Sequence, residues 1–115
     1  MKLYSYNKCG TCRKAKKYLL DHNIKFEEID ITETPPTKAE LKRAIKEKGM
    51  RKLFNTSGVQ YKELKIKDKI GEFSDAEAID LLSTNGRLVK RPIAIDKNNI
   101  TVGFNEDEYK STWTD

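Results

Sequence analysis

The chain has 115 residues, of which 36% are charged and 37% hydrophobic, and its net charge is +5. This length predicts a single domain over residues 1–115 with one hydrophobic core. No apolar run approaches the ~20 residues that a membrane span needs, and no recognised DNA-reading motif is present. We therefore exclude a membrane protein and direct DNA binding, and we expect a monomer.

Charge is spread unevenly along the chain. Lysines are concentrated between residues 38 and 69, whereas residues 72–80 and 105–108 are acidic. A basic surface of this kind attracts anions, nucleic acid or an acidic protein partner. A solvated lysine face is the simpler explanation for most of it, so charge alone does not identify a partner.

The first third of the chain alternates between strand and helix patterns. Residues 2–6 predict a strand, and residues 10–22 predict a helix. Residues 24–31 predict a second strand, in which the apolar phase changes between Phe26 and Ile29. That change indicates a bulge, or a strand buried on both faces.

Two helices are predicted in the middle of the chain, and each begins at a capping box. The box at residues 37–40 opens a helix that stops at Gly49. The box at residues 74–77 opens a helix that buries Ile79 and Leu82 and stops at Gly86. Between these two helices, the expected packing anchors are Tyr61, Leu64, Ile66 and Ile70.

The last third predicts a β-hairpin and a closing helix. Residues 93–95 and 100–102 alternate in hydrophobicity across a polar turn, and a helix begins after Asn105 and runs towards Trp113. The full order predicts an α/β, thioredoxin-like fold. It is a four-stranded mixed sheet flanked by helices, with a helical insertion at approximately residues 37–85.

Both cysteines of the chain lie in one turn, as Cys9-Gly10-Thr11-Cys12. A C-x-x-C between a strand and a helix is typical of thioredoxin-like redox motifs. The helix N-terminus and the nearby Lys8 and Arg13 favour a thiolate, and so lower the pKa of a cysteine placed there. We expect Cys9 to be the outward, more acidic thiol and Cys12 the less exposed one.

Three alternative roles stay open for these cysteines. A structural disulfide conflicts with an N-terminus that enters a strand without an apolar signal segment, a start that predicts a cytoplasmic protein. Zinc needs four ligands, and beyond the cysteines only His22 is at hand, so we expect no metal. Inert thiols are the third alternative.

Arg91-Pro92 immediately precedes the predicted strand at residues 93–95. In thioredoxin-like folds a cis proline lies at this point and faces the cysteine pair. We expect the Arg91–Pro92 bond to be cis, and a trans proline at a strand start is the alternative.

These motifs resemble the arsenate reductase-like family, which includes glutaredoxin-linked arsenate reductases and Spx-type regulators. The resemblance is carried by Lys-Cys-Gly-Thr-Cys-Arg-Lys-Ala at residues 8–15, Thr-Pro-Pro-Thr at 34–37 and Arg-Pro-Ile at 91–93. Residues 102–108 are similar to the Spx branch in particular. The resemblance covers nearly the whole chain, and it implies a thioredoxin-like fold with a helical insertion.

Similarity to the arsenate reductases implies that Cys9 attacks an arsenate oxyanion that Arg91 helps to hold. Those enzymes commonly lack a second cysteine, whereas here Cys12 is present and its thiol can attack an oxidised or arsenylated Cys9 to close a disulfide. The two further arginines of those enzymes have no match in residues 53–56 or 102–104, which weakens the arsenate site. The resemblance implies no bound cofactor, and an external reductant that is either glutaredoxin with glutathione or thioredoxin. The residues expected to bind an anion or support the thiolate are Lys8, Gly10, Thr11, Arg13 and Pro92.

Similarity to the Spx branch implies a different function, a redox switch that binds the α subunit of RNA polymerase. Gly49 falls where that branch has a glycine at its binding surface, although a helix C-cap explains this glycine as well. The chain ends soon after its last predicted helix, without the longer tail of the regulators. Our first hypothesis is therefore a cytosolic thiol–disulfide oxidoreductase of this family, and the regulator is the second.

Overall fold

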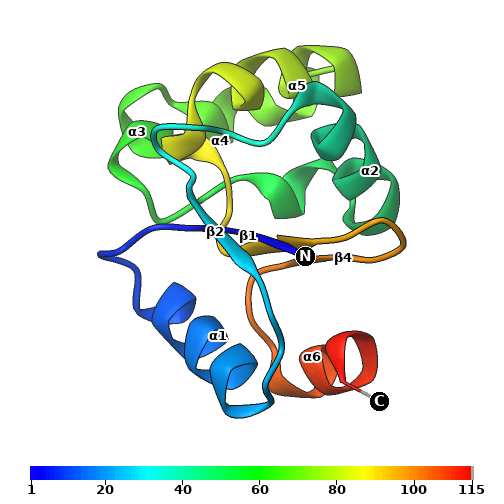
Figure 1. The fold of residues 1–115 in the computed structure, drawn as a ribbon. Helices are drawn as coiled ribbons and strands as arrows, with labels where there is room; N and C mark the ends of the chain where they lie inside the picture. The colour runs from blue at the N-terminus through cyan, green and yellow to red at the C-terminus, as the bar shows by residue number, and fades with distance from the viewer. Residues whose placement is uncertain (115) are drawn as a thin grey trace.

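The first three elements form a β-α-β unit in the computed structural model, which describes residues 1–114. Strand β1 (Lys2–Ser5) leads into helix α1 (Gly10–Asp21), and the chain returns as strand β2 (Glu27–Asp30) (Figure 1). The two strands are parallel, because the helix between them carries the chain back to the starting end of the sheet.

The helical insertion follows, and its two longer helices begin at the predicted capping boxes. The hydroxyl of Thr37 accepts a hydrogen bond from the Glu40 N–H at 3.1 Å, and the Glu40 carboxylate accepts one from the Thr37 N–H at 2.9 Å. Ser74 and Glu77 are linked in the same way. The insertion consists of α2 (Lys38–Lys48), η1 (Met50–Leu53), α3 (Val59–Glu63), α4 (Ile66–Lys69), η2 (Ile70–Glu72), α5 (Asp75–Thr84) and η3 (Gly86–Leu88), in which η marks a 3-10 turn.

The chain then returns to the sheet as the hairpin β3 (Ile93–Ile95) and β4 (Ile100–Val102), and it closes with helix α6 (Glu106–Trp113). The strand order is β2-β1-β3-β4, and both pairs that involve β3 are antiparallel. This four-stranded mixed sheet confirms the predicted fold class. No helix within residues 1–114 is long and apolar enough to cross a membrane.

Each face of the sheet has its own hydrophobic core. Side chains alternate along the strands, so Tyr4 and Ile93 belong to one core while Leu3 and Ala94 belong to the other. The first core lies under the insertion, and the second lies against α1 and α6 on the opposite face (Figure 1). The sheet is thus covered on both sides, with α1 and its cysteines on the thinner side.

Strand β2 is shorter than predicted, at four residues instead of the expected 24–31. It is the edge strand of the sheet and its residues are mostly exposed, so it is not buried on both faces. The change of apolar phase has another cause. Phe26 packs towards the α1 side before the strand begins, and Ile31 enters the opposite core after it ends.

Leu64 was predicted as a packing anchor and is instead 42% exposed. It caps the C-terminus of α3, and the left-handed Lys65 that follows (φ 55°) turns the chain, so the side chain of Leu64 faces solvent. The other three predicted anchors are buried, and they are Tyr61, Ile66 and Ile70.

Helix α5 ends at Thr84, before the predicted stop at Gly86. Its core positions are Ala78 and Leu82, and Ile79 is only partly buried. Gly86 has a different role from a helix stop, because a Cβ on it would lie 1.7 Å from the carbonyl oxygen of Ile31. This close approach of two backbone segments requires glycine.

Candidate active site

Cys9 is the N-cap of helix α1. Its N–H donates to the carbonyl of Tyr6 at 3.1 Å, which closes the turn after β1, and its carbonyl accepts from the Arg13 N–H at 3.2 Å. The Sγ atom of Cys9 accepts a hydrogen bond from the Cys12 N–H at 3.4 Å. The sulfur thus takes the place of the side-chain oxygen of an ordinary N-cap, at the positive end of the helix dipole.

Opposing effects set the pKa of the Cys9 thiol. Partial burial raises this pKa, but hydrogen bonds from the Cys12 side chain and N–H, the charge of Arg91 and the Thr11 N–H together lower it by more. The net pKa lies below the ordinary value for cysteine. A larger share of Cys9 is therefore the nucleophilic thiolate at neutral pH.

Cys12 shows the opposite shift. Its side chain is 1% exposed, and burial, followed by its hydrogen bond to Cys9, raises the pKa of its thiol to about 12. Cys9 is the more exposed of the two, as predicted, and both are free thiols. The motif therefore combines one thiol that readily loses its proton with a second that keeps it.

Arg91 lies beside this pair, directly before β3. The Arg91–Pro92 bond is cis, as expected. The guanidinium carbon of Arg91 lies 4.8 Å from the centroid of the Tyr6 ring, within the range of a cation–π contact. Its Nη1 atom is buried and has no hydrogen-bond partner among residues 1–114, which is uncommon for a buried donor.

A cavity of about 180 Å³ lies next to the Cys9 thiol. Its walls come from the start of α1, the bend after η1 and the segment before β3. The lining residues are Cys9, Thr11, Asn55, Ser57, Gly58, Lys90 and Arg91. Hydroxyl, amide and cationic groups dominate this lining, and such groups bind a small oxyanion.

Four of these lining residues were not predicted from the sequence: Asn55, Ser57, Gly58 and Lys90. Asn55 is held in place, since its Nδ2 donates to the Arg87 carbonyl at 3.5 Å and its Oδ1 accepts from the Ser57 hydroxyl at 3.2 Å. Asn55 lies in the segment 53–56, which matches a region that carries an arginine in the arsenate reductases, and that match is the signal from which this wall could have been found.

Residues 102–104 match the second region that carries an arginine in the arsenate reductases, and they do not line the cavity. Phe104 instead packs in the core against α1 and α6, with its ring 4.8 Å from that of Tyr109 and 6.0 Å from that of Tyr18. In this chain the segment therefore has a packing role.

The predicted supporting residues occupy different places. Thr11 lines the cavity, whereas Lys8, Gly10 and Arg13 are exposed beside it and do not line it. Pro92 is buried behind it. Within residues 1–114, no three His, Cys, Asp or Glu side chains are grouped so that they could hold a metal ion.

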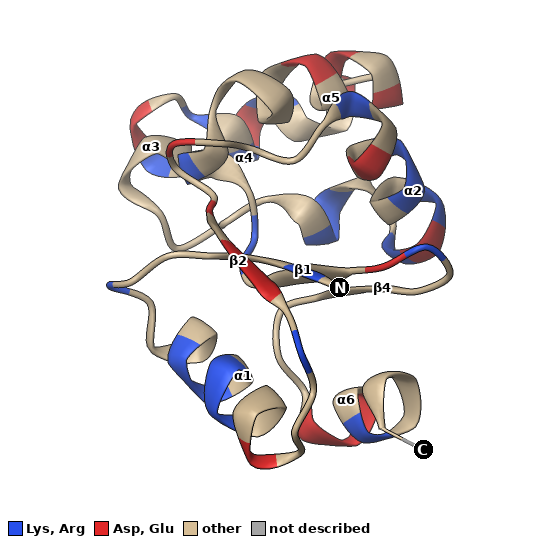
Figure 2. Ribbon diagram, viewed as in Figure 1, with Lys and Arg blue, Asp and Glu red and all other residues tan. Residues whose placement is uncertain are grey.

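The first turns of α1 carry positive charge where helices usually carry acids. α1 has no acidic residue in its first turn, whereas α2, α5 and α6 all do. Figure 2 shows the basic residues along α1. A cation at a helix N-terminus costs about 0.3–1 kcal/mol of helix stability. These cations therefore oppose local helix stability, and the charge that lowers the pKa of Cys9 comes from Arg91 and not from them.

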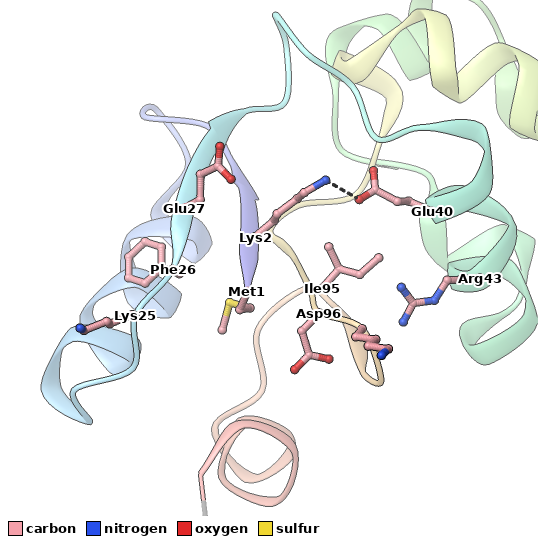
Figure 3. A pocket seen from close by; sticks show the side chains of 10 residues that line it. Met1, Lys2, Lys25, Phe26, Glu27, Glu40, Arg43, Ile95 and Asp96 are labelled. Carbon is pink, nitrogen blue, oxygen red and sulfur yellow. Dashed lines mark hydrogen bonds and ion pairs between the residues drawn. The ribbon is translucent and has the colours of Figure 1, made fainter.

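A larger cavity of about 590 Å³ lies at the other end of β1 (Figure 3). Its walls carry charges of both signs, and Glu40 there already accepts hydrogen bonds from Lys2 at 3.3 Å and from the Tyr4 hydroxyl at 2.6 Å. No cysteine lines this cavity. We therefore place the candidate active site at Cys9.

The fold and the site together define a thioredoxin-like protein with a C-x-x-C at a helix N-terminus and a cis proline before the third strand. The sequence profile of the ArsC family matches residues 4–112. The chain belongs to the ArsC family.

Two relatives and one solved structure illustrate this membership. The chain is 47% identical over 112 residues to the uncharacterized protein YusI of Bacillus subtilis, covering 96% of this chain and 95% of YusI. It is 35% identical over 105 residues to the global transcriptional regulator Spx of Streptococcus agalactiae, covering 90% of this chain and 75% of Spx. The crystal structure of an ArsC family related protein from Bacteroides fragilis superposes with a TM-score of 0.90 at 43% identity, covering 96% and 94% of the two chains.

Proposed function

We propose that this chain is a thiol–disulfide oxidoreductase in which Cys9 is the nucleophile and Cys12 the resolving thiol. The hydrogen bond from the Cys12 N–H to the Cys9 sulfur, with the opposite pKa shifts of the two thiols, carries this proposal. A cytoplasmic location is part of it, because reducing compartments keep such a pair in the thiol form.

The chemistry proceeds in two displacements. The Cys9 thiolate attacks a sulfur of the oxidised partner, which forms a mixed disulfide and releases a thiolate that takes up a proton. Cys12 then loses its proton and attacks Cys9, which releases the second partner thiol and leaves a Cys9–Cys12 disulfide. Two electrons have passed to the partner, and an external dithiol returns them, supplied by glutaredoxin with glutathione or by thioredoxin.

Arsenate is the candidate small substrate. Its attack by Cys9 would form a sulfur–arsenic bond with loss of water, and attack by Cys12 on Cys9 would release arsenite and the disulfide. Arg91 supports this role, because it lines the thiol cavity and its Nη1 has no hydrogen-bond partner among residues 1–114. Asn55 and Lys90 line the cavity in place of the missing arginines, but neither can donate two parallel hydrogen bonds to an oxyanion as a guanidinium does. We therefore expect weak activity.

Redox-dependent binding to the α subunit of RNA polymerase is the second candidate function. It is favoured by the 35% identity to a global transcriptional regulator Spx. Gly49 is exposed at the C-terminus of α2 with φ 86°, a conformation that also suits a plain helix cap. This candidate needs the same cysteine pair, used as a switch.

One paired experiment separates the two candidates. Arsenate reduction is measured with the glutaredoxin and thioredoxin systems, beside a pull-down with the isolated α subunit. Turnover that requires Cys9 and Cys12, without retention of the α subunit, supports the enzyme. Retention that changes with the oxidation state of the pair, without turnover, supports the regulator.

A further inference from the structure

Some of the cations near Cys9 form ion pairs with carboxylates, and others do not. Farther along α1, Lys16 pairs with Glu28 at 3.1 Å and Lys17 pairs with Asp21 at 2.8 Å. Closer to the thiol, no carboxylate within residues 1–114 forms an ion pair with any of four exposed cations. These four, which we call the thiol-rim cations, are Lys8, Arg13, Lys14 and Lys90.

The thiol-rim cations extend beyond the cavity. Lys90 lines it together with Arg91, so a small anion inside it would meet these two charges. Lys8, Arg13 and Lys14 lie outside it, on the exposed surface of the turn and of α1. An ion held inside this cavity of about 180 Å³ does not contact these three side chains, because they do not line it, so pairing them requires a larger acidic partner.

We propose that the oxidised partner of the Cys9 site is a protein whose disulfide is flanked by carboxylates. This inference rests on the proposed thiol–disulfide function and names its substrate class. The carboxylates dock on the thiol-rim cations and bring the disulfide to Cys9, and the two displacements described above then transfer two electrons to it. Attraction between opposite charges raises the encounter rate and falls with added salt.

The test is a single-turnover reaction of the pre-reduced chain with three disulfide peptides. They share one sequence, except that the positions flanking the cysteines are all Glu, all Gln or all Lys. At ~10 mM ionic strength, where the Debye length is ~30 Å, we expect the Glu peptide to react about tenfold faster than the Gln peptide and the Lys peptide to react more slowly still. At ~1 M salt the three rates should converge.

The variant K8E/R13E/K14E should reverse this order of peptides. The ratio of the Glu to the Gln rate is the readout, because a change in the reactivity of Cys9 itself cancels in the ratio. The control K42E/K46E/K110E carries the same change of net charge on α2 and α6, and it should keep the wild-type ratio. Thermal melts establish that both variants are folded.

Equal rates for the three peptides at low salt, or an unchanged ratio in K8E/R13E/K14E, would overturn the preference for an acidic partner and leave the thiol–disulfide function standing. No reaction with any of the peptides would overturn both. Faster reaction with the Glu peptide that is lost or reversed in K8E/R13E/K14E, and kept in K42E/K46E/K110E, supports the proposal.

Discussion

The backbone N–H of Cys12 donates a hydrogen bond to the sulfur of Cys9, 3.4 Å away. Cys12 therefore lowers the pKa of Cys9 in two ways, through its backbone N–H and through its side chain. The pKa of Cys12 itself is raised. The short spacing of the motif forces this coupling, since three residues is the separation at which an N-cap side chain meets a backbone N–H of the first helical turn.

Alkylation against pH measures this division of roles. In the Cys12→Ser variant, Cys9 should react with a midpoint below the ordinary ~8.5 of a cysteine, because the helix N–H groups and Arg91 remain. In the Cys9→Ser variant, Cys12 should stay unreactive at neutral pH, because burial raises its pKa. Faster alkylation of Cys12 than of Cys9 near pH 7 would contradict the assignment.

Arg91 should affect both the pKa of the Cys9 thiol and the binding of an oxyanion substrate. Arg91→Ala removes a positive charge next to Cys9, so the alkylation midpoint should move to higher pH. Loss of a charge-assisted contact of about 1.5–3 kcal/mol should slow any arsenate turnover by about ten- to a hundredfold. Arg91→Lys should restore much of the midpoint but less of the turnover, because an ammonium lacks the planar fork.

Arg87→Ala is the matched control for Arg91, since Arg87 is exposed in the same segment and does not line the thiol cavity. It should leave both readouts unchanged. If Arg91→Ala shifts neither the midpoint nor the turnover, Arg91 has no part in the site.

Glu40 should stabilise the fold in a pH-dependent way. Burial raises the pKa of the Glu40 carboxyl. Hydrogen bonds from Tyr4 and Thr37 and the charge of Lys2 lower this pKa by a larger amount, so the folded pKa lies below the unfolded value. Its contribution is therefore complete above the unfolded pKa of about 4.3 and is lost as the pH falls through the folded pKa. Glu40→Gln should cost about 1–3 kcal/mol of unfolding free energy at neutral pH, measured by urea denaturation.

Glu77→Gln tests whether the capping box alone explains such a loss. Glu77 closes the equivalent box with Ser74 on α5 but is exposed, and no tyrosine or lysine within residues 1–114 is paired with it. Its substitution should cost less than that of Glu40. Equal losses in the two variants would show that Tyr4 and Lys2 add nothing.

Gly86 should tolerate no side chain. A Cβ at this position would lie 1.7 Å from the Ile31 carbonyl oxygen, so Gly86→Ala must displace backbone and should cost about 3 kcal/mol or more. Gly10→Ala is the control, because in the described part of the chain nothing outside its own helix turn and chain neighbours lies within 4 Å of a Cβ there, and alanine favours a helix. Differential scanning calorimetry should show a large drop in melting temperature for Gly86→Ala alone.

Local chemistry made much of this fold predictable from the sequence. Both capping boxes bond residues three apart, and the polar turn between β3 and β4 is equally local, so their residue types fix them directly. The fold class followed from the order of the elements. The short edge strand β2 was harder, because Phe26 and Ile31 pack into opposite cores from outside the strand and imitate a longer one.

Only the local part of the candidate site could be predicted from the sequence, because its other residues are brought together by tertiary packing. Cys9 and Cys12 share one turn, so their relation was readable from spacing. Asn55 and Lys90 line the same cavity as Cys9 but come from segments far away in the chain, through a bend and a return to the sheet that spacing does not encode. The contact of Arg91 with the Tyr6 ring is also a product of tertiary packing.

Mass spectrometry of trapped intermediates tests the central claim most directly. The reduced chain and its two single-cysteine variants are mixed with a small disulfide and quenched with acid. We expect a Cys9–Cys12 disulfide, two hydrogens lighter, in the wild type, a stable mixed disulfide on Cys9 in Cys12→Ser, and no adduct in Cys9→Ser. An adduct on Cys12 in Cys9→Ser, with none on Cys9 in Cys12→Ser, would contradict it.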